Sequence, residues 1–120
     1  MERISQICLL AVVLFMPLFA LAGEGYTIAG KSGFIHFIEV ESAQQTNEDV
    51  YRLAVAEACA GKPVCQAQFW INKAPTAFPL TADQADSKVV HWQQNLNTGM
   101  RRWLVKCSAS QVFSNERECI

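Results

Sequence analysis

Residues 59–70 read Cys-Ala-Gly-Lys-Pro-Val-Cys-Gln-Ala-Gln-Phe-Trp, and within them a helical pattern ends and a strand pattern begins. The preceding segment, from Thr46 to Ala60, has an acidic first turn and an apolar stripe at helical spacing. Gly61 predicts the end of that helix, because glycine readily adopts the left-handed conformation that follows many last helical turns. Residues 64–71 then alternate between two kinds of side chain, as in a strand with one face in the core.

The same periodicities predict two further strands and a second helix. Residues 34–41 and 100–108 alternate as strands do. Residues 81–96 begin with Thr-Ala-Asp-Gln, a capping-box pattern, and carry apolar residues at helical spacing. We therefore expect an α+β fold in the order strand, helix, strand, helix, strand. In that fold, two helices pack on one face of a small three-stranded sheet.

The N-terminus has the composition of a signal peptide. No charged residue occurs from Ile7 to Ala22, and Ala20-Leu-Ala22 offers small residues for cleavage before Gly23. The apolar segment is short for a membrane span, and an uncleaved anchor is the alternative interpretation. The prediction is a signal peptide at residues 1–22, which contacts the membrane only transiently, and a single domain at residues 23–120.

The cysteine count agrees with export. The chain has 5 cysteines, and Cys8 would leave with the signal peptide. An even number of cysteines in an exported small domain indicates two disulfides, with three pairings open. We expect Cys59 to pair with Cys65 and Cys107 with Cys119, because both are local closures. Each bond would stabilise the fold by about 2–4 kcal/mol. The expected location is therefore periplasmic or secreted.

Charge and motif context argue against nucleic acids and nucleotides as ligands. The chain has 10 Lys or Arg and 11 Asp or Glu, so it lacks the basic excess of a generic nucleic-acid binder. The stretch from Gly25 to Ser32 matches the phosphate-loop pattern G-x-x-x-x-G-K-S letter for letter. A phosphate loop joins a buried strand to a helix. Here a segment rich in β-branched and aromatic residues follows, so no nucleotide is expected.

Catalytic and metal-binding signatures are weak in this sequence. Cys59 lies at the end of a predicted helix, where the helix dipole opposes a thiolate. The sequence has no His or Cys pairs at zinc-ligand spacing, so neither a cofactor nor a metal is expected. His36 is predicted to be a hydrogen-bonded structural residue and His91 a solvated surface residue. The alternative is a small cell-envelope hydrolase that uses His36 or His91 as its base.

A set of spaced residues runs through the predicted domain. It comprises Cys59 and Cys65 with five residues between them, Phe69-Trp70, Pro75, Pro79-Leu-Thr81, Asn97-Thr-Gly99 and Cys107. This pattern resembles that of small exported bacterial proteins of uncharacterised function. The resemblance implies export and no particular activity.

A binding surface is the functional site that the sequence favours. Trp70 ends the polar face of its strand and is followed by Asn72 and Lys73, while Arg101 and Arg102 begin the last predicted strand. If these strands are neighbours, the side chains form an aromatic and cationic patch of the kind enriched at protein interfaces. We therefore expect a non-catalytic binding protein, such as an inhibitor, immunity factor or adaptor. Its expected partner is an envelope or extracellular macromolecule, and a protein rather than a nucleic acid.

Overall fold

The computed structural model of the protein describes residues 24–108 and 111–120. The predicted signal peptide at residues 1–22 lies outside these residues. Within the two described ranges, no helix combines the length and the apolar character that a membrane span requires.

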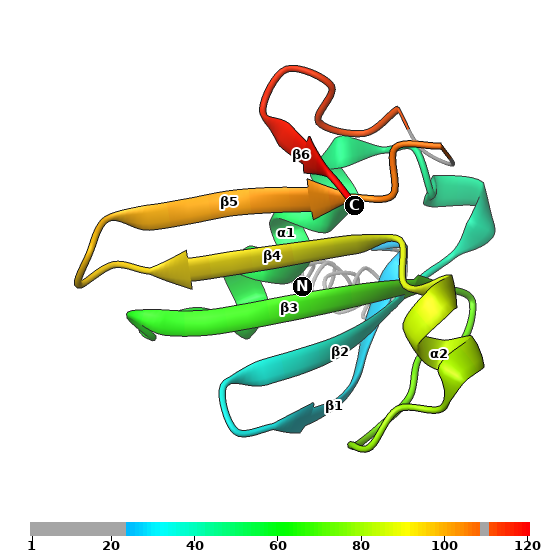
Figure 1. Ribbon diagram of the computed structural model, residues 1–120, viewed down its shortest axis with the longest axis horizontal. Coiled ribbons are helices and arrows are strands. Elements are labelled where there is room, and N and C mark those ends of the chain that lie inside the picture. Colours follow the sequence, from blue (N-terminus) through cyan, green and yellow to red (C-terminus); the bar gives the residue numbers. More distant parts are fainter. Residues whose placement is uncertain (1–23, 109–110) are drawn as a thin grey trace, which may run out of the picture.

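Six strands form one mixed sheet, and they lie side by side in chain order (Figure 1). Neighbouring strands are antiparallel, except that β2 with β3 and β5 with β6 are parallel pairs. Parallel neighbours need a long crossover, and helix α1 (Glu48–Ala58) provides it between β2 and β3. The strands are β1 (Tyr26–Ser32), β2 (Ile35–Val40), β3 (Val64–Ile71), β4 (Val90–Asn95), β5 (Met100–Val105) and β6 (Arg117–Cys119).

The two α-helices lie on opposite faces of the sheet. A short 3-10 helix, η3 (Ser42–Gln44), precedes α1, which packs against the side of β3 that carries Phe69. Helix α2 (Ala82–Ser87) accepts a hydrogen bond from Trp70, the next residue along β3. Successive strand residues point to opposite faces, so α2 covers the other side. Figure 1 shows α2 in front of the sheet and α1 behind it.

The expectation of a three-stranded sheet in the order strand, helix, strand, helix, strand, with both helices on one face, is wrong. Residues 26–32, which lie outside the three predicted strands, form β1, which returns to β2 through a tight turn at Gly33 with φ 62°. The helix predicted over residues 81–96 stops at Ser87, and residues 90–95 form β4 instead. Val90 and Trp92 enter the core from one face of β4. A strand places Val90 and Trp92 on the same face and buries both of them. The helical spacing that the sequence also permits buries them less well.

The predicted helix starts are confirmed. The Asn47 side chain accepts a hydrogen bond from the backbone N–H of Asp49 at 3.1 Å and caps α1, while Gly61 follows the end of α1 with φ 71°. Thr81 and Gln84 form the reciprocal capping box at the start of α2. The strands predicted at residues 34–41, 64–71 and 100–108 are confirmed as β2, β3 and β5.

An aromatic cluster fills the core between α1 and the sheet. Trp103 stacks on Phe113 with ring centroids 4.0 Å apart, and it meets Trp92 at 4.6 Å. Tyr51 of α1 contacts Phe69 edge to face at 5.0 Å. Such pairs add roughly 0.5–1.5 kcal/mol beyond the burial of their area. Because Phe113 follows β5, the C-terminal segment completes this core.

Both predicted disulfides are confirmed. Cys59 is bonded to Cys65, with Cα atoms 5.7 Å apart, and Cys107 to Cys119, with Cα atoms 5.2 Å apart. The first bond joins the end of α1 to β3, and the second ties β6 back to the end of β5. Disulfides persist in oxidising compartments, so this pairing is compatible with an extracellular or otherwise oxidising location.

A second, smaller core lies on the α2 face. Phe37 and Trp70 are buried there with Ala74, which belongs to the loop between β3 and α2. The loop also crosses β1 closely. A Cβ atom added at Gly30 would lie 2.5 Å from the carbonyl oxygen of Thr76 and 2.9 Å from its Cα. Only a glycine at this position lets the loop close over the second core.

Replacing Gly30 with alanine is expected to destabilise the fold by roughly 1–3 kcal/mol, because backbone atoms of Thr76 cannot move aside without displacing the loop. Urea denaturation followed by far-UV circular dichroism measures the change. Thr27→Ala is the matched control, since Thr27 is an exposed residue of the same strand. A Gly30→Ala variant as stable as the control would contradict the close approach.

Candidate functional site

The predicted aromatic and cationic patch is not assembled as expected. Trp70 is only 2% exposed, and its indole N–H donates a hydrogen bond of 2.7 Å to the carbonyl oxygen of Gln84. Asn72 and Lys73 are exposed just beyond β3. The Asn72 side chain accepts a hydrogen bond from the backbone of Ser42, 3.1 Å away. Trp70 therefore supports α2 and offers no aromatic surface to a partner.

Arg101 and Arg102 lie on opposite faces of the sheet. They are consecutive residues of β5, and both are exposed. Arg102 is on the face that α2 partly covers, because it pairs across the sheet with Gln93, and Gln93 pairs with Gln66 of β3. Arg101 is on the α1 face. Of the predicted residues, Arg102 alone belongs to the site described next.

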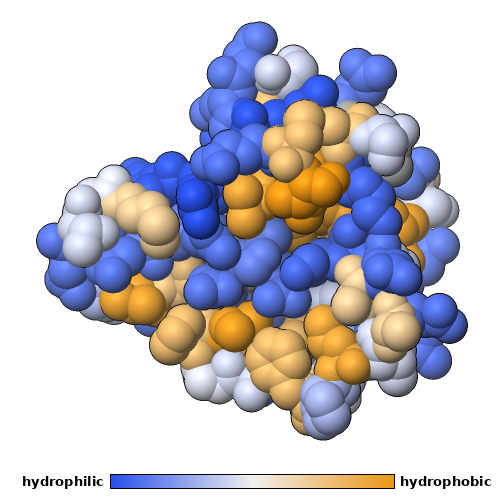
Figure 2. All heavy atoms as spheres, viewed as in Figure 1, coloured by the Kyte–Doolittle hydropathy of each residue, from blue (hydrophilic) through white to orange (hydrophobic). Residues whose placement is uncertain are grey.

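A polar surface occupies the part of the α2 face that α2 leaves uncovered. Figure 2 shows hydrophilic residues across the middle of this face, between hydrophobic residues over β1 and β2 and others near β6. We call this surface the polar face. Its central residues are brought together by the register of β3, β4 and β5 and are Gln66, Gln68, His91, Gln93 and Arg102.

Hydrogen bonds connect most of the polar face. His91 Nε2 lies 2.8 Å from Gln66 Oε1, so the ring N–H donates to that amide oxygen. Arg102 Nε donates to Gln93 Oε1 at 2.7 Å, and its guanidinium also lies 3.7 Å from a Glu118 carboxylate oxygen. The Arg102–Glu118 pair is half-exposed, and such pairs contribute little to stability. These contacts orient the side chains as a preformed surface.

Gln68 breaks this pattern, because its Oε1 atom is buried without a hydrogen-bond partner in the described part of the chain. The residue is 6% exposed and pairs directly with His91 across the sheet. A buried acceptor with no donor costs about 1–3 kcal/mol. The fold carries this cost at the centre of the polar face, beneath the side chains that meet solvent.

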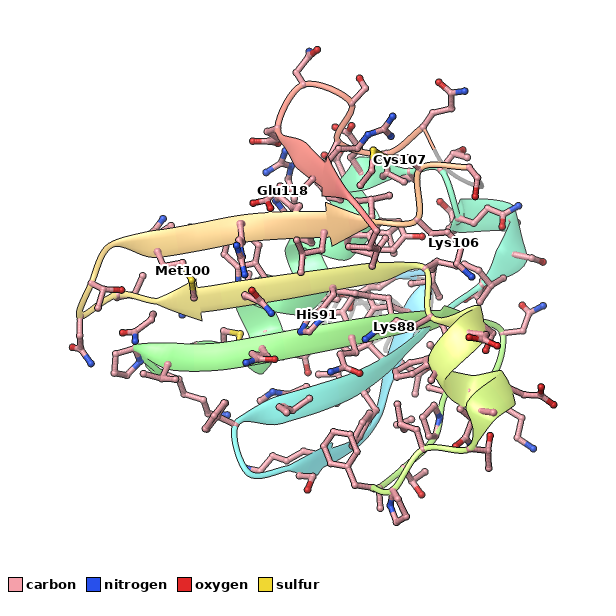
Figure 3. The ribbon with its side chains drawn as sticks, viewed as in Figure 1. Lys88, His91, Met100, Lys106, Cys107 and Glu118 are labelled. Atoms are coloured by element: carbon pink, nitrogen blue, oxygen red, sulfur yellow. A yellow bond between two sulfur atoms is a disulfide. The ribbon has the colours of Figure 1, made fainter. Side chains whose placement is uncertain are left out.

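Lys88 and His91 adjoin one another on the polar face, as Figure 3 shows. Burial lowers the pKa of Lys88. Burial, followed by the positive charges of Lys88 and Arg102, lowers the pKa of His91 to about 4. His91 is therefore neutral at physiological pH. The Lys88 ammonium group makes no hydrogen bond or ion pair within residues 24–108 and 111–120.

Among residues 24–108 and 111–120, no carboxylate is paired with either histidine as it would be with a general base. The charged groups that shift the pKa of His91 are both cations. His36 is buried, with Nδ1 3.4 Å from the carbonyl oxygen of Gln66 and Nε2 3.5 Å from the Lys62 ammonium. The structural role predicted for His36 is supported by these contacts. The solvated role predicted for His91 is wrong, since it is 9% exposed.

Metal binding has no candidate site in the residues that the structure describes, where no group of three His, Cys, Asp or Glu side chains converges. The phosphate-loop pattern from Gly25 to Ser32 lies on β1, and a tight turn into β2 follows it. The strand–loop–helix context of a phosphate site is therefore missing there.

Sequence reasoning missed Gln68 and Lys88 as site residues, and it considered His91 only as the base of the alternative hydrolase. The alternation of residues 64–71 did place Gln66 and Gln68 together on a polar strand face. The signal that would have added His91 is the alternation from Val90 to Asn95, in which His91 and Gln93 share one side. Assigning that segment to a helix separated the two residues. No known protein family, no curated protein and no solved structure matches this chain.

Proposed function

We propose that the protein is an exported, non-catalytic binding protein whose polar face receives an acidic segment of another protein. The half-buried Lys88 side chain carries this proposal, because its ammonium group lies beside the hydrogen-bonded polar face and has no counter-ion among the described residues. The two disulfides support the exported part of the proposal, since small domains held by disulfides work in oxidising compartments.

The chemistry of the polar face favours a polypeptide as the partner. Lys88 and Arg102 offer positive charge to acceptors on a partner. An acidic peptide segment provides carboxylates for these cations. The flanking amides of Gln66 and Gln93 can accept and donate in addition.

The charges of the polar face also argue against a purely apolar partner surface. Lys88 is half-buried and lacks a counter-ion among the described residues, so a carboxylate placed beside it would gain from the reduced exposure to water. A neutral His91 avoids adding a third positive charge to the desolvated centre. Electrostatic attraction of this kind sets specificity and association rate more than affinity.

The test is affinity capture with matched variants. The immobilised wild-type protein is exposed to envelope extract and culture medium, and a retained protein is purified for titration. Lys88→Gln and Arg102→Gln are each expected to weaken its binding by about tenfold, and binding should weaken further with added salt. Lys31→Gln is the control, because it removes the same charge from an exposed residue of β1 on the opposite face, outside the pocket described below.

The outcomes separate cleanly. Loss in the Arg102→Gln variant with retention in Lys31→Gln supports binding at the polar face. Equal loss, or no loss, in the two variants would contradict it. Circular dichroism of each variant checks that the exposed substitutions leave the fold intact.

A further inference from the structure

A pocket of about 260 Å³ opens on the α1 face, opposite the polar face. One wall is α1, where small side chains leave room above the sheet. The floor and the other wall belong to β4 and β5. The lining residues are Arg52, Val55, Ala56, Trp92, Gln94, Arg101 and Trp103.

Two guanidinium groups enter this pocket from different elements. Arg52 of α1 is held in place, because its guanidinium lies 4.9 Å from the ring centroid of Phe113 and pairs with Glu116. Arg101 of β5 is exposed, and it makes no hydrogen bond or ion pair in the part of the chain that the structure describes. No acidic side chain is among the lining residues, and Glu116 compensates the charge of Arg52. Arg101 therefore gives the pocket its uncompensated positive charge.

The apolar part of the pocket is aromatic, and the Trp92 indole within it is fixed by hydrogen bonds. Trp92 and Trp103 form a pair with ring centroids 4.6 Å apart. The Trp92 indole N–H donates to Gln94 Oε1 at 3.0 Å, and Gln94 Nε2 donates to the carbonyl oxygen of Lys62 at 2.7 Å. These bonds fix the indole and the amide. The arginines remain as the strong donors available to a ligand.

We propose that this pocket binds a small aromatic carboxylate. The ring would lie against Trp92 and Trp103, since aromatic rings associate favourably with indoles. The carboxylate would pair with Arg52 and Arg101, whose planar guanidinium groups match its geometry. The pocket is smaller than most sites for drug-sized ligands, which suits one ring with one acidic group. This site is independent of the polar face.

Such a carboxylate has two sources, a free aromatic acid or the C-terminal residue of a polypeptide. Phenylacetate serves as the probe for the first and N-acetyl-glycyl-phenylalanine for the second. Phenylacetamide is the neutral control, because it keeps the ring and removes the charge. Tryptophan fluorescence and the indole N–H signals of Trp92 and Trp103 in NMR spectra report binding.

We expect at least one acid to shift these signals saturably, with phenylacetamide binding at least about tenfold more weakly. Arg101→Gln should weaken binding by about tenfold, whereas Arg102→Gln, on the other face of β5, should leave it unchanged. Ala56→Leu should abolish binding by filling the pocket from an exposed helix position. Ala60→Leu, an exposed position just past α1, is its control.

The tighter of the two acids identifies the source of the carboxylate. Absence of a saturable shift with both acids would overturn the proposal, as would equal binding of phenylacetamide. Equal effects of Arg101→Gln and Arg102→Gln would overturn it as well. Loss of partner capture with intact binding of the acids would count against the polar face alone, so the two proposals fail separately.

Discussion

Replacing Trp70 with alanine is expected to lower the free energy of unfolding by roughly 3–5 kcal/mol. Trp70 is 2% exposed and packs with Phe37 in the core beneath α2. The substitution also removes the donor to Gln84, which leaves a helix carbonyl without its partner. Urea denaturation monitored by far-UV circular dichroism measures the loss.

Two further variants make this result diagnostic. Lys73→Ala should change the stability by no more than about 0.5 kcal/mol, because Lys73 is exposed beyond the end of β3. Trp70→Phe should fall between the two, since it keeps a ring in the core and loses only the hydrogen bond and part of the volume. If Trp70→Ala were as stable as Lys73→Ala, Trp70 would be a surface residue, as the predicted patch required.

The local parts of the fold could be predicted because they depend on neighbouring residues. The capping side chains of Asn47 and Thr81 and the stop at Gly61 act within one helical turn. The two disulfides close short loops, so choosing local pairs was enough. Strand β3 is bounded by Pro63 and by Asn72 with φ 69°, and its alternation is unambiguous.

The sheet as a whole could not be predicted, because its extent depends on distant partners. Residues 26–32 become a strand only by pairing with β2, and residues 117–119 only by pairing with β5 beside a disulfide. Taken without their neighbours, residues 90–95 fit both the helical and the strand periodicity. The neighbouring strands β3 and β5 hydrogen-bond to the two edges of β4, and this pairing makes the segment a strand.

The candidate site could not be predicted for the same reason, because it also depends on pairing between distant segments. The proximity of Gln68 and His91 follows from the register between β3 and β4, which no single segment encodes. Consecutive residues of a strand point to opposite faces, so the prediction of a strand over residues 100–108 already separates Arg101 from Arg102. The predicted patch overlooked that consequence. It also treated Trp70 as exposed, although covering this side of β3 required α2 to lie on the face opposite α1.

Lowering the pH from 7 to 4 is expected to cost the fold about 2–3 kcal/mol of stability through His91 alone. Its pKa is lowered from 6.5 to about 4, first by burial and then by the charges of Lys88 and Arg102. The unfolded chain therefore binds the proton first. The contribution of neutral His91 is complete above pH 6.5 and is lost as the pH falls toward 4.

His91→Gln isolates this contribution, because glutamine does not titrate and can still bond to Gln66. Urea denaturation at several pH values between 4 and 7 should give a shallower decline for the variant than for the wild-type protein. Burial also lowers the pKa of His36, but His36 is present in both proteins and its contribution cancels in the difference. Parallel curves would mean that His91 is hydrated in the folded state. The polar face would then lack the desolvated centre that favours a carboxylate beside Lys88.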